Sequence, residues 1–286
     1  MNITLVNGFY MSTDTIVGGW SGTPSQEQQD NANIIRSFFL NEGWTINAIC
    51  GMLGCMQGES TINPAFIQAT NRSRLPNSAY NLTDVPNNVM INFYKEYYHD
   101  SRKAYGIGLV QWDGYSNRNG VDGQKLVNYA TSNNIQWFDG WTQMYRIKGE
   151  QEFDVQHQND NKHNSFFRKV RVAGNYYDFT NFPYSTQPPE ILARAWTYGY
   201  EVNQGGEGYR PANARWFYDW FTSPDAPAII QPVDFLAPLP YDPQDPPFDP
   251  DNPNPPDPSG RDFLPVWFLW SMTNKRKELK RPCRRM

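Results

Sequence analysis

The feature that most limits the fold of this 286-residue chain is a proline-rich segment after Ser223. Thirteen prolines fall within the 35 residues from 224 to 258, interleaved with aspartate and asparagine. Such a composition cannot build a packed core and favours extended polyproline II. We therefore predict a linker over 223–260 and a folded domain before it.

The chain after the linker is short, aromatic and basic. Residues 263–270 are almost all aromatic or aliphatic, and seven Lys/Arg against Glu278 alone give residues 274–286 a charge of +6. Eight such residues are too few to cross a bilayer. We predict a C-terminal anchor over 261–286 that docks on a partner protein. Transient contact with an anionic membrane interface and a free tail are the alternatives.

The charge of the remaining chain argues against nucleic acid as a partner. The whole chain carries −4, so the residues before the basic tail carry −10 (−4 minus +6). An acidic body is poorly suited to following a nucleic-acid backbone. The three histidines and three cysteines show neither zinc-site spacing nor a disulfide framework, so we expect no cofactor and no metal.

Apolar residues recur at helical spacing in several stretches before the linker. The first begins near Gln26 and is closed by Gly43. The second can be capped by Thr45 and is stopped by Pro64. Further helical stretches cover residues 123–132, 139–151, 189–200 and 212–221.

These stretches define the predicted domain. Residues 1–25 are expected to be an irregular N-terminal arm, because their glycines and Pro24 oppose a long regular element. Residues 65–120 are mixed: they contain asparagine-rich loops, a short aromatic stretch around Phe93-Tyr94, and a glycine-bearing turn at 105–112. The segment 26–222 is thus predicted to be one mainly α domain, of α+β type, with a small loop-rich or β lobe.

A candidate general acid lies near the end of the second helix. Glu59 follows a run of apolar positions, and a carboxyl group placed against apolar walls is desolvated, which raises its pKa. A protonated carboxyl near neutral pH can donate to a glycosidic oxygen. A solvated glutamate at a helix end is an equal alternative.

Two further segments favour a sugar site. In residues 106–113, glycines allow close approach of the backbone to a ligand, Gln111 can hydrogen-bond sugar amides, and Trp112 can stack on a sugar face. Residues 193–201 add another aromatic wall with Tyr200 and a carboxylate at Glu201.

Together these segments resemble the phage tail lysozyme family, a branch of the lysozyme-like superfamily that includes goose-type lysozymes and soluble lytic transglycosylases. The resemblance is strongest to tail-knob peptidoglycan hydrolases of short-tailed phages of Gram-positive bacteria. The matching residues are Trp44-Thr45, Ala48 to Gly54, Met56-Gln57, Glu59 to Pro64 and Gly108 to Trp112, with a looser match at Tyr200-Glu201 and Arg210-Pro211.

The resemblance implies cleavage of the β-1,4 bond between N-acetylmuramic acid and N-acetylglucosamine in peptidoglycan. Glu59 would be the catalytic acid, because it occupies the family's Glu-Ser position with Ser60. Gln111 and Trp112 would line the glycan cleft, with Tyr200 on its other wall. The sequence departs from the family at Cys55, where asparagine is usual, and in the spacing after Glu201.

The second carboxylate is left open between Asp113 and Glu201, with Asp84 a poorer choice. Inverting hydrolysis places it roughly 6.5–9.5 Å from the acid and retaining hydrolysis about 5–5.5 Å. A lytic transglycosylase needs no second carboxylate, because the sugar's own 6-hydroxyl attacks. We favour hydrolysis slightly.

The whole chain suggests a virion enzyme that opens the host cell wall during infection. The start lacks the features of a secretory signal, so we expect synthesis in the host cytoplasm and assembly into a phage tail tip or knob. Its partners would be peptidoglycan and other tail proteins, held by the anchor, with the N-terminal arm as a second attachment. An endolysin and a non-catalytic tail or adsorption protein are the alternatives.

Overall fold

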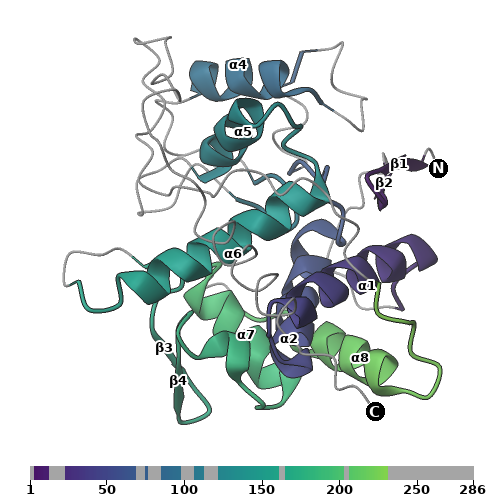
Figure 1. The fold of residues 1–286 in the computed structure, drawn as a ribbon, viewed down its shortest axis with the longest axis vertical. Helices are drawn as coiled ribbons and strands as arrows, with labels where there is room; N and C mark the ends of the chain where they lie inside the picture. The colour runs from purple at the N-terminus through teal and green to yellow at the C-terminus, as the bar shows by residue number, and fades with distance from the viewer. Residues whose placement is uncertain are drawn as a thin grey trace, which may run out of the picture. The chain divides into compact units, whose positions relative to one another are not determined.

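The computed structural model describes residues 3–12, 23–68, 75–76, 85–97, 106–112, 122–160, 165–202 and 206–230. These residues are mostly helical, which confirms the mainly α prediction (Figure 1). The helices are α1 (Gln26–Asn41), α2 (Ile46–Ser60), α4 (Asn87–Tyr97), α5 (Asp122–Ser132), α6 (Gly140–Gln156), α7 (Pro189–Gly199) and α8 (Arg210–Thr222). The predicted anchor and the predicted linker beyond residue 230 lie outside the described residues.

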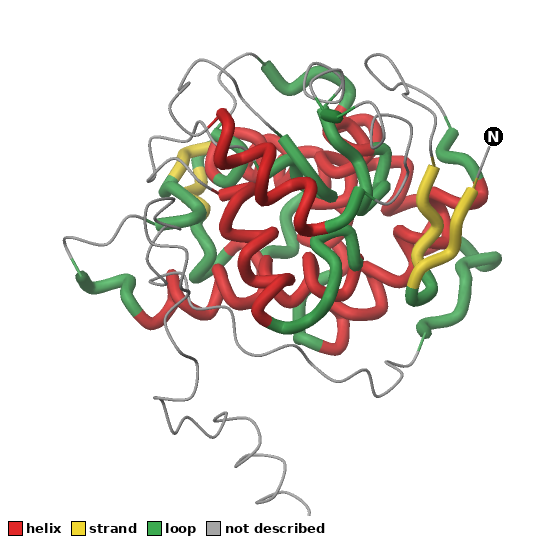
Figure 2. The backbone as a smooth tube through the Cα atoms, turned by 90° about the horizontal axis from the view of Figure 1, so that it is seen from above, coloured by secondary structure: helices red, strands yellow, loops and turns green. Residues whose placement is uncertain are grey.

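Strands occur in the described residues as two hairpins at the margins of the helical body (Figure 2). They are β1 (Ile3–Val6) with β2 (Phe9–Ser12), and β3 (Val170–Val172) with β4 (Asn175–Tyr177). A short 3-10 turn, η1 (Phe182–Tyr184), precedes α7. None of the described helices is long and apolar enough to cross a bilayer.

The ends of the first two helices follow the local sequence signals. Ser25 and Gln28 form a reciprocal capping box at the start of α1, and Gly43 follows its end with φ +83°. Thr45 caps α2 by accepting from the Ala48 N–H at 3.2 Å. The helix was predicted to continue as far as Pro64, but α2 ends about one turn earlier, at Ser60. Thr61 takes the left-handed conformation at φ 55° and ends the helix there.

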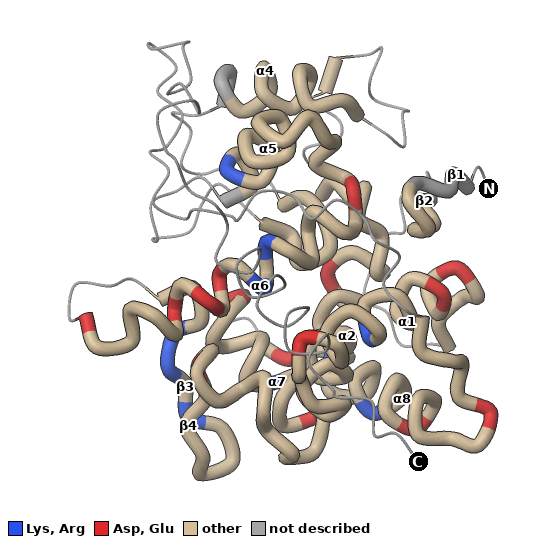
Figure 3. Tube along the Cα trace, in the orientation of Figure 1, with Lys and Arg blue, Asp and Glu red and all other residues tan. Residues whose placement is uncertain are grey.

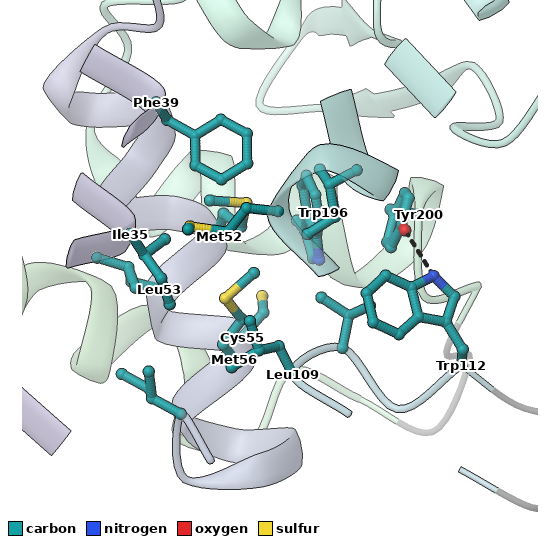
Figure 4. Packing of buried hydrophobic residues seen from close by; sticks show 14 of the residues in the cluster. Ile35, Phe39, Met52, Leu53, Cys55, Met56, Leu109, Trp112, Trp196 and Tyr200 are labelled. Atoms are coloured by element: carbon teal, nitrogen blue, oxygen red, sulfur yellow. Dashed lines mark hydrogen bonds between the residues drawn. The ribbon is translucent and has the colours of Figure 1, made fainter. Parts of the chain in front are cut away.

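Helix α2 is packed between α1, α7 and α8, and most of its residues are buried. Two glycines allow this packing. A Cβ on Gly51 would lie 2.7 Å from Leu192 Cβ of α7, and one on Gly54 would lie 2.5 Å from the backbone O of Arg210 in α8. Cys55 lies fully buried in the same core, among Met52, Met56 and Leu109 (Figure 4).

Part of the predicted N-terminal arm is regular, which corrects the expectation of an irregular segment. Asn7 and Gly8 take positive φ of 50° and 89°, the requirement of a tight two-residue hairpin turn. Phe9 and Met11 of β2 are fully buried, and the Phe9 ring packs edge-on against Trp141 of α6 at 6.2 Å. The hairpin therefore completes the domain's core.

Helix α4 was also missed, because its sequence was read as loop. Val89, Ile91 and its aromatics are poor helix formers, so propensity gave little signal. Its buried residues, Met90, Phe93 and Tyr94, lie on the helix that packs against α5. Burial in the tertiary structure, rather than local propensity, thus stabilises this segment as a helix. The β part of the predicted small lobe is limited, in the described residues of 65–120, to bridges of Ile107 with Ile67 and Trp112.

The described start of the predicted linker is bound to α1. Arg36 Nη2 donates to the carbonyl of Pro227 at 2.7 Å, and Asn33 Nδ2 donates to that of Ala228 at 3.1 Å. The Ile230 N–H donates to Ser37 Oγ at 2.9 Å. Buried polar groups of α1 are thereby partnered by backbone of the segment 227–230.

We expect Gly54→Ala to lower the free energy of unfolding by about 1–3 kcal/mol, because α8 must move away from the added methyl group. The control is Gly43→Ala, where no atom lies within 4 Å and only the positive φ costs stability, roughly 1 kcal/mol. Urea unfolding measures both. A smaller loss at Gly54 than at Gly43 would contradict the close contact between α2 and α8.

Candidate active site

Glu59 and Arg210 meet where the last turn of α2 faces the first residue of α8. Arg210 Nη2 donates to Glu59 Oε1 in an ion pair. The Glu59 side chain is 23% exposed and that of Arg210 is 13% exposed. Gly58 makes room for the arginine, because a Cβ there would lie 3.2 Å from Arg210 Cγ. The absence of side chains at Gly54 and Gly58 thus lets Arg210 lie along α2.

Glu201 approaches the same guanidinium from the end of α7. Its Oε2 lies 3.1 Å from Arg210 Nε, and its side chain is only 6% exposed. Neither of its oxygens receives a well-directed hydrogen bond from the described residues. One arginine therefore lies between two carboxyl groups with very different access to solvent.

The two environments act on the charge of these carboxyl groups in opposite directions. Burial raises the pKa of Glu201 to about 8, with a smaller lowering effect from the nearby Cys55 thiol. At Glu201 burial therefore favours the protonated form, against the attraction of Arg210. At Glu59, partial exposure and a neighbouring guanidinium both favour a charged carboxylate. The desolvated carboxyl predicted at Glu59 thus lies at Glu201.

The wall beside Glu59 is a tight turn over residues 106–112. Ser60 is fully buried, and its hydroxyl donates to the Leu109 carbonyl at 2.8 Å, which ties α2 to the turn. Gln111 takes a φ of 53°, and its Nε2 donates to the Gly108 carbonyl at 2.9 Å. Gln143 of α6 accepts from the Leu109 N–H at 2.8 Å.

Trp112 and Tyr200 lie in the core behind this wall. The Trp112 Nε1–H donates to the Tyr200 hydroxyl at 3.1 Å (Figure 4), and that hydroxyl donates to Glu150. Arg146 pairs with Glu150 at 2.8 Å, and its guanidinium carbon lies 4.6 Å from the centre of the Trp112 ring. Trp112 is 5% exposed, so this geometry gives it a supporting position.

The structure thus brings together six of the seven residues that we predicted for the site. Glu59 and Glu201 meet through Arg210, Ser60 and Gln111 through the turn, and Trp112 and Tyr200 through their hydrogen bond. Direct contact of the last four with glycan stays a prediction, and the burial of Ser60, Trp112 and Tyr200 favours support of the wall. Asp113 and Asp84 lie outside the described residues.

Sequence reasoning gave no role to Arg210, Arg146 or Glu150. The first was visible as the Arg-Pro of the closing motif, but nothing in its spacing shows that it reaches Glu59. The pair in α6 lies at i, i+4 and reads as an ordinary surface ion pair, whereas both side chains are buried. In the described residues no group of three His, Cys, Asp or Glu side chains is arranged to hold a metal.

A mainly α domain with a glutamate at the end of a buried helix, beside a glycine-rich turn, defines the class of lysozyme-like domains. A family model described as phage tail lysozyme matches residues 30–221, about two thirds of the chain, and the chain belongs to this family.

A curated relative is Morphogenesis protein 1 of Bacillus phage B103. It is 34% identical over an alignment of 126 residues, and the match covers 40% of this chain and 27% of the relative. The chain therefore matches about a quarter of the length of this relative.

We expect the stability of this protein to fall with rising pH between about 4.5 and 8 through Glu201. Over that range the folded state holds the proton, which the unfolded state releases, so unfolding is favoured by up to about 1.4 kcal/mol per pH unit. Glu201→Gln should remove this slope.

The measurement is urea unfolding at pH 5, 6, 7 and 8. Glu152→Gln, at a side chain 57% exposed, is the matched control and should leave the slope unchanged. If the free energy of unfolding changed with pH in the same way for wild type and for Glu201→Gln, Glu201 would not hold its proton in the folded state.

Proposed function

We propose that this protein cleaves the β-1,4 bond between N-acetylmuramic acid and N-acetylglucosamine in peptidoglycan, with Glu59 exchanging a proton with the glycosidic oxygen. The observation that carries the proposal is that Glu59 is the solvent-accessible member of a carboxyl pair held on Arg210. Membership of the phage tail lysozyme family supports it.

Arg210 and Glu201 set the charge on Glu59 in this mechanism. While Arg210 pairs with Glu59, burial favours a proton on Glu201 and the ion pair favours charge on Glu59. A glycan that displaces the guanidinium from Glu59 leaves Glu201, already 3.1 Å from Arg210 Nε, as the carboxyl partner of the arginine, and the proton of Glu201 then passes to Glu59. Glu201 then favours its charged form and Glu59 its protonated form, as a general acid requires.

Glu201 acts through Arg210 because its own oxygens are buried. A carboxylate that positions a water for hydrolysis must face the substrate, and Glu201 does not. Asp113 therefore stays the predicted base for hydrolysis. The burial of Glu201 also favours a second candidate, a lytic transglycosylase, which uses one acid/base.

The biological setting is a phage particle. A morphogenesis protein among the relatives supports a virion-associated enzyme that opens the host wall locally, rather than an endolysin released at lysis. Attachment to other tail proteins would use residues 261–286. The β1–β2 hairpin is committed to the domain's own core, so this part of the arm offers less surface for attachment.

Glu59→Gln keeps the shape of the side chain and removes the proton, so we expect glycan cleavage to fall at least about 100-fold. Mass spectrometry of digested peptidoglycan measures it and also reports the reaction. Reducing muramic ends indicate hydrolysis, and 1,6-anhydromuramic ends indicate transglycosylation. Glu152→Gln is the control; equal product from Glu59→Gln would exclude Glu59 as the acid.

Removing the cation beside Glu59 should change the pH dependence of cleavage. In Arg210→Met the carboxyl group of Glu59 keeps its proton to higher pH, so the alkaline limb of the pH–rate profile should shift to higher pH. Arg210→Lys restores the charge and should move the limb back toward wild type. Superimposable profiles for all three proteins would rule out control of Glu59 by Arg210.

A further inference from the structure

The β3–β4 hairpin presents a basic surface that the proposed glycan site does not use. Its turn at Ala173-Gly174 takes positive φ at both residues, and the strands pair so that Arg171 stands opposite Tyr176. Val172 and Tyr177 are buried, which leaves Arg171 and Tyr176 on the outer face. Tyr176 is 55% exposed, among the largest exposures of an aromatic in the described residues.

Two cations lie near this ring. Lys169 Nζ lies 5.4 Å and Arg171 Cζ 5.7 Å from the ring centre. Arg168, a third exposed cation, directly precedes Lys169 in the chain. Within the described residues none of the three cations has a carboxylate within 4 Å. Asp178, the acidic residue after β4, accepts from the Thr180 N–H and hydroxyl.

The hairpin is fixed on the aromatic core that carries α7. Phe167 is fully buried and packs edge-on against Trp196 at 5.9 Å. The Arg168 N–H donates to the Gly199 carbonyl at 3.0 Å, and a Cβ on Gly199 would lie 2.0 Å from the Phe167 ring. The surface is therefore preformed, so little of the binding free energy is lost in ordering the hairpin when a partner binds.

The charges of the body make this surface unusual. Residues before the basic tail carry −10, yet Arg168, Lys169 and Arg171 fall within four consecutive residues at β3, where the basic residues are seen together in Figure 3. Exposed cations gathered at one place attract an anion that neutralises them. Arginine and lysine are the side chains that bind phosphate.

We propose that the β3–β4 hairpin binds a phosphate-bearing anionic polymer of the bacterial cell wall. The three cations face phosphates, and Tyr176 packs on the carbon skeleton between them. Nucleic acid fits less well, because single-strand binding uses a series of aromatic side chains, whereas Tyr176 is the exposed aromatic of this hairpin and Tyr177 is buried. This binding is independent of glycan cleavage and holds the enzyme on its insoluble target.

The test is binding of the full chain to poly(glycerol phosphate) at several salt concentrations. The hairpin variant R168Q/K169Q/R171Q should bind at least tenfold more weakly at low salt. The slope of log affinity against log salt should fall by about 0.7 for each lost phosphate contact, as for other flexible polyanions. Tyr176→Leu should weaken binding about threefold with the slope unchanged.

The matched control is K280Q/R284Q/R285Q, which removes the same charge from the basic tail. If this variant loses as much affinity as the hairpin variant, net charge rather than the hairpin surface is responsible, and the proposal fails. It fails also if the hairpin variant binds like wild type, or if single-stranded DNA with the same number of phosphates binds more tightly than the polymer.

Two readouts keep the result separate from folding and from the glycan site. Urea unfolding should give the same midpoint for the hairpin variant and wild type, because all three replaced side chains are exposed. Cleavage of glycan stripped of phosphate polymer should also be unchanged, whereas cleavage of intact walls should fall with the loss of binding.

Discussion

The close contact of α2 with α7 and α8 is the constraint on which the rest of the structure depends. Gly51 and Gly54 carry no side chain where the neighbouring helices touch α2, so the backbones approach as closely as atoms allow. Because α8 begins at Arg210, this contact sets a guanidinium against the last turn of α2. The end of α7 brings Glu201 to the same place, so the site follows from helix packing.

Electrostatics in the site follow from burial more than from residue type. Glu59 and Glu201 carry the same chemical group and contact the same arginine, yet one is partly exposed and the other is enclosed by α2, α7 and α8. Desolvation keeps a proton on the enclosed group, and the ion pair keeps charge on the other. The surroundings thereby push the protonation of two identical side chains in opposite directions, which is the usual basis of acid/base pairs.

Local signals predicted those elements whose ends are marked by capping and by turn residues. Thr45 and Gly43 identified the junction between the first two helices, and apolar periodicity identified α5 to α8 closely. Helix α4 was missed because its β-branched and aromatic residues weaken the local helical signal, whereas its buried residues pack against α5. The β1–β2 hairpin carried its Asn7-Gly8 turn signal in a segment read as irregular.

By itself the sequence determined the mainly α class and the motif that indicates a lysozyme-like domain, and it singled out Glu59 and Glu201 as candidate site residues. Periodicity, capping and motif spacing are local properties of the chain, so they can be read without the fold. Only the tertiary structure decided that Arg210, 151 residues from Glu59, pairs with it, and that Glu201 rather than Glu59 is the buried carboxyl. It also turned Trp112 into a buried support beneath Arg146. Charge state and exposure depend on which distant segments enclose a side chain, and no local pattern records that.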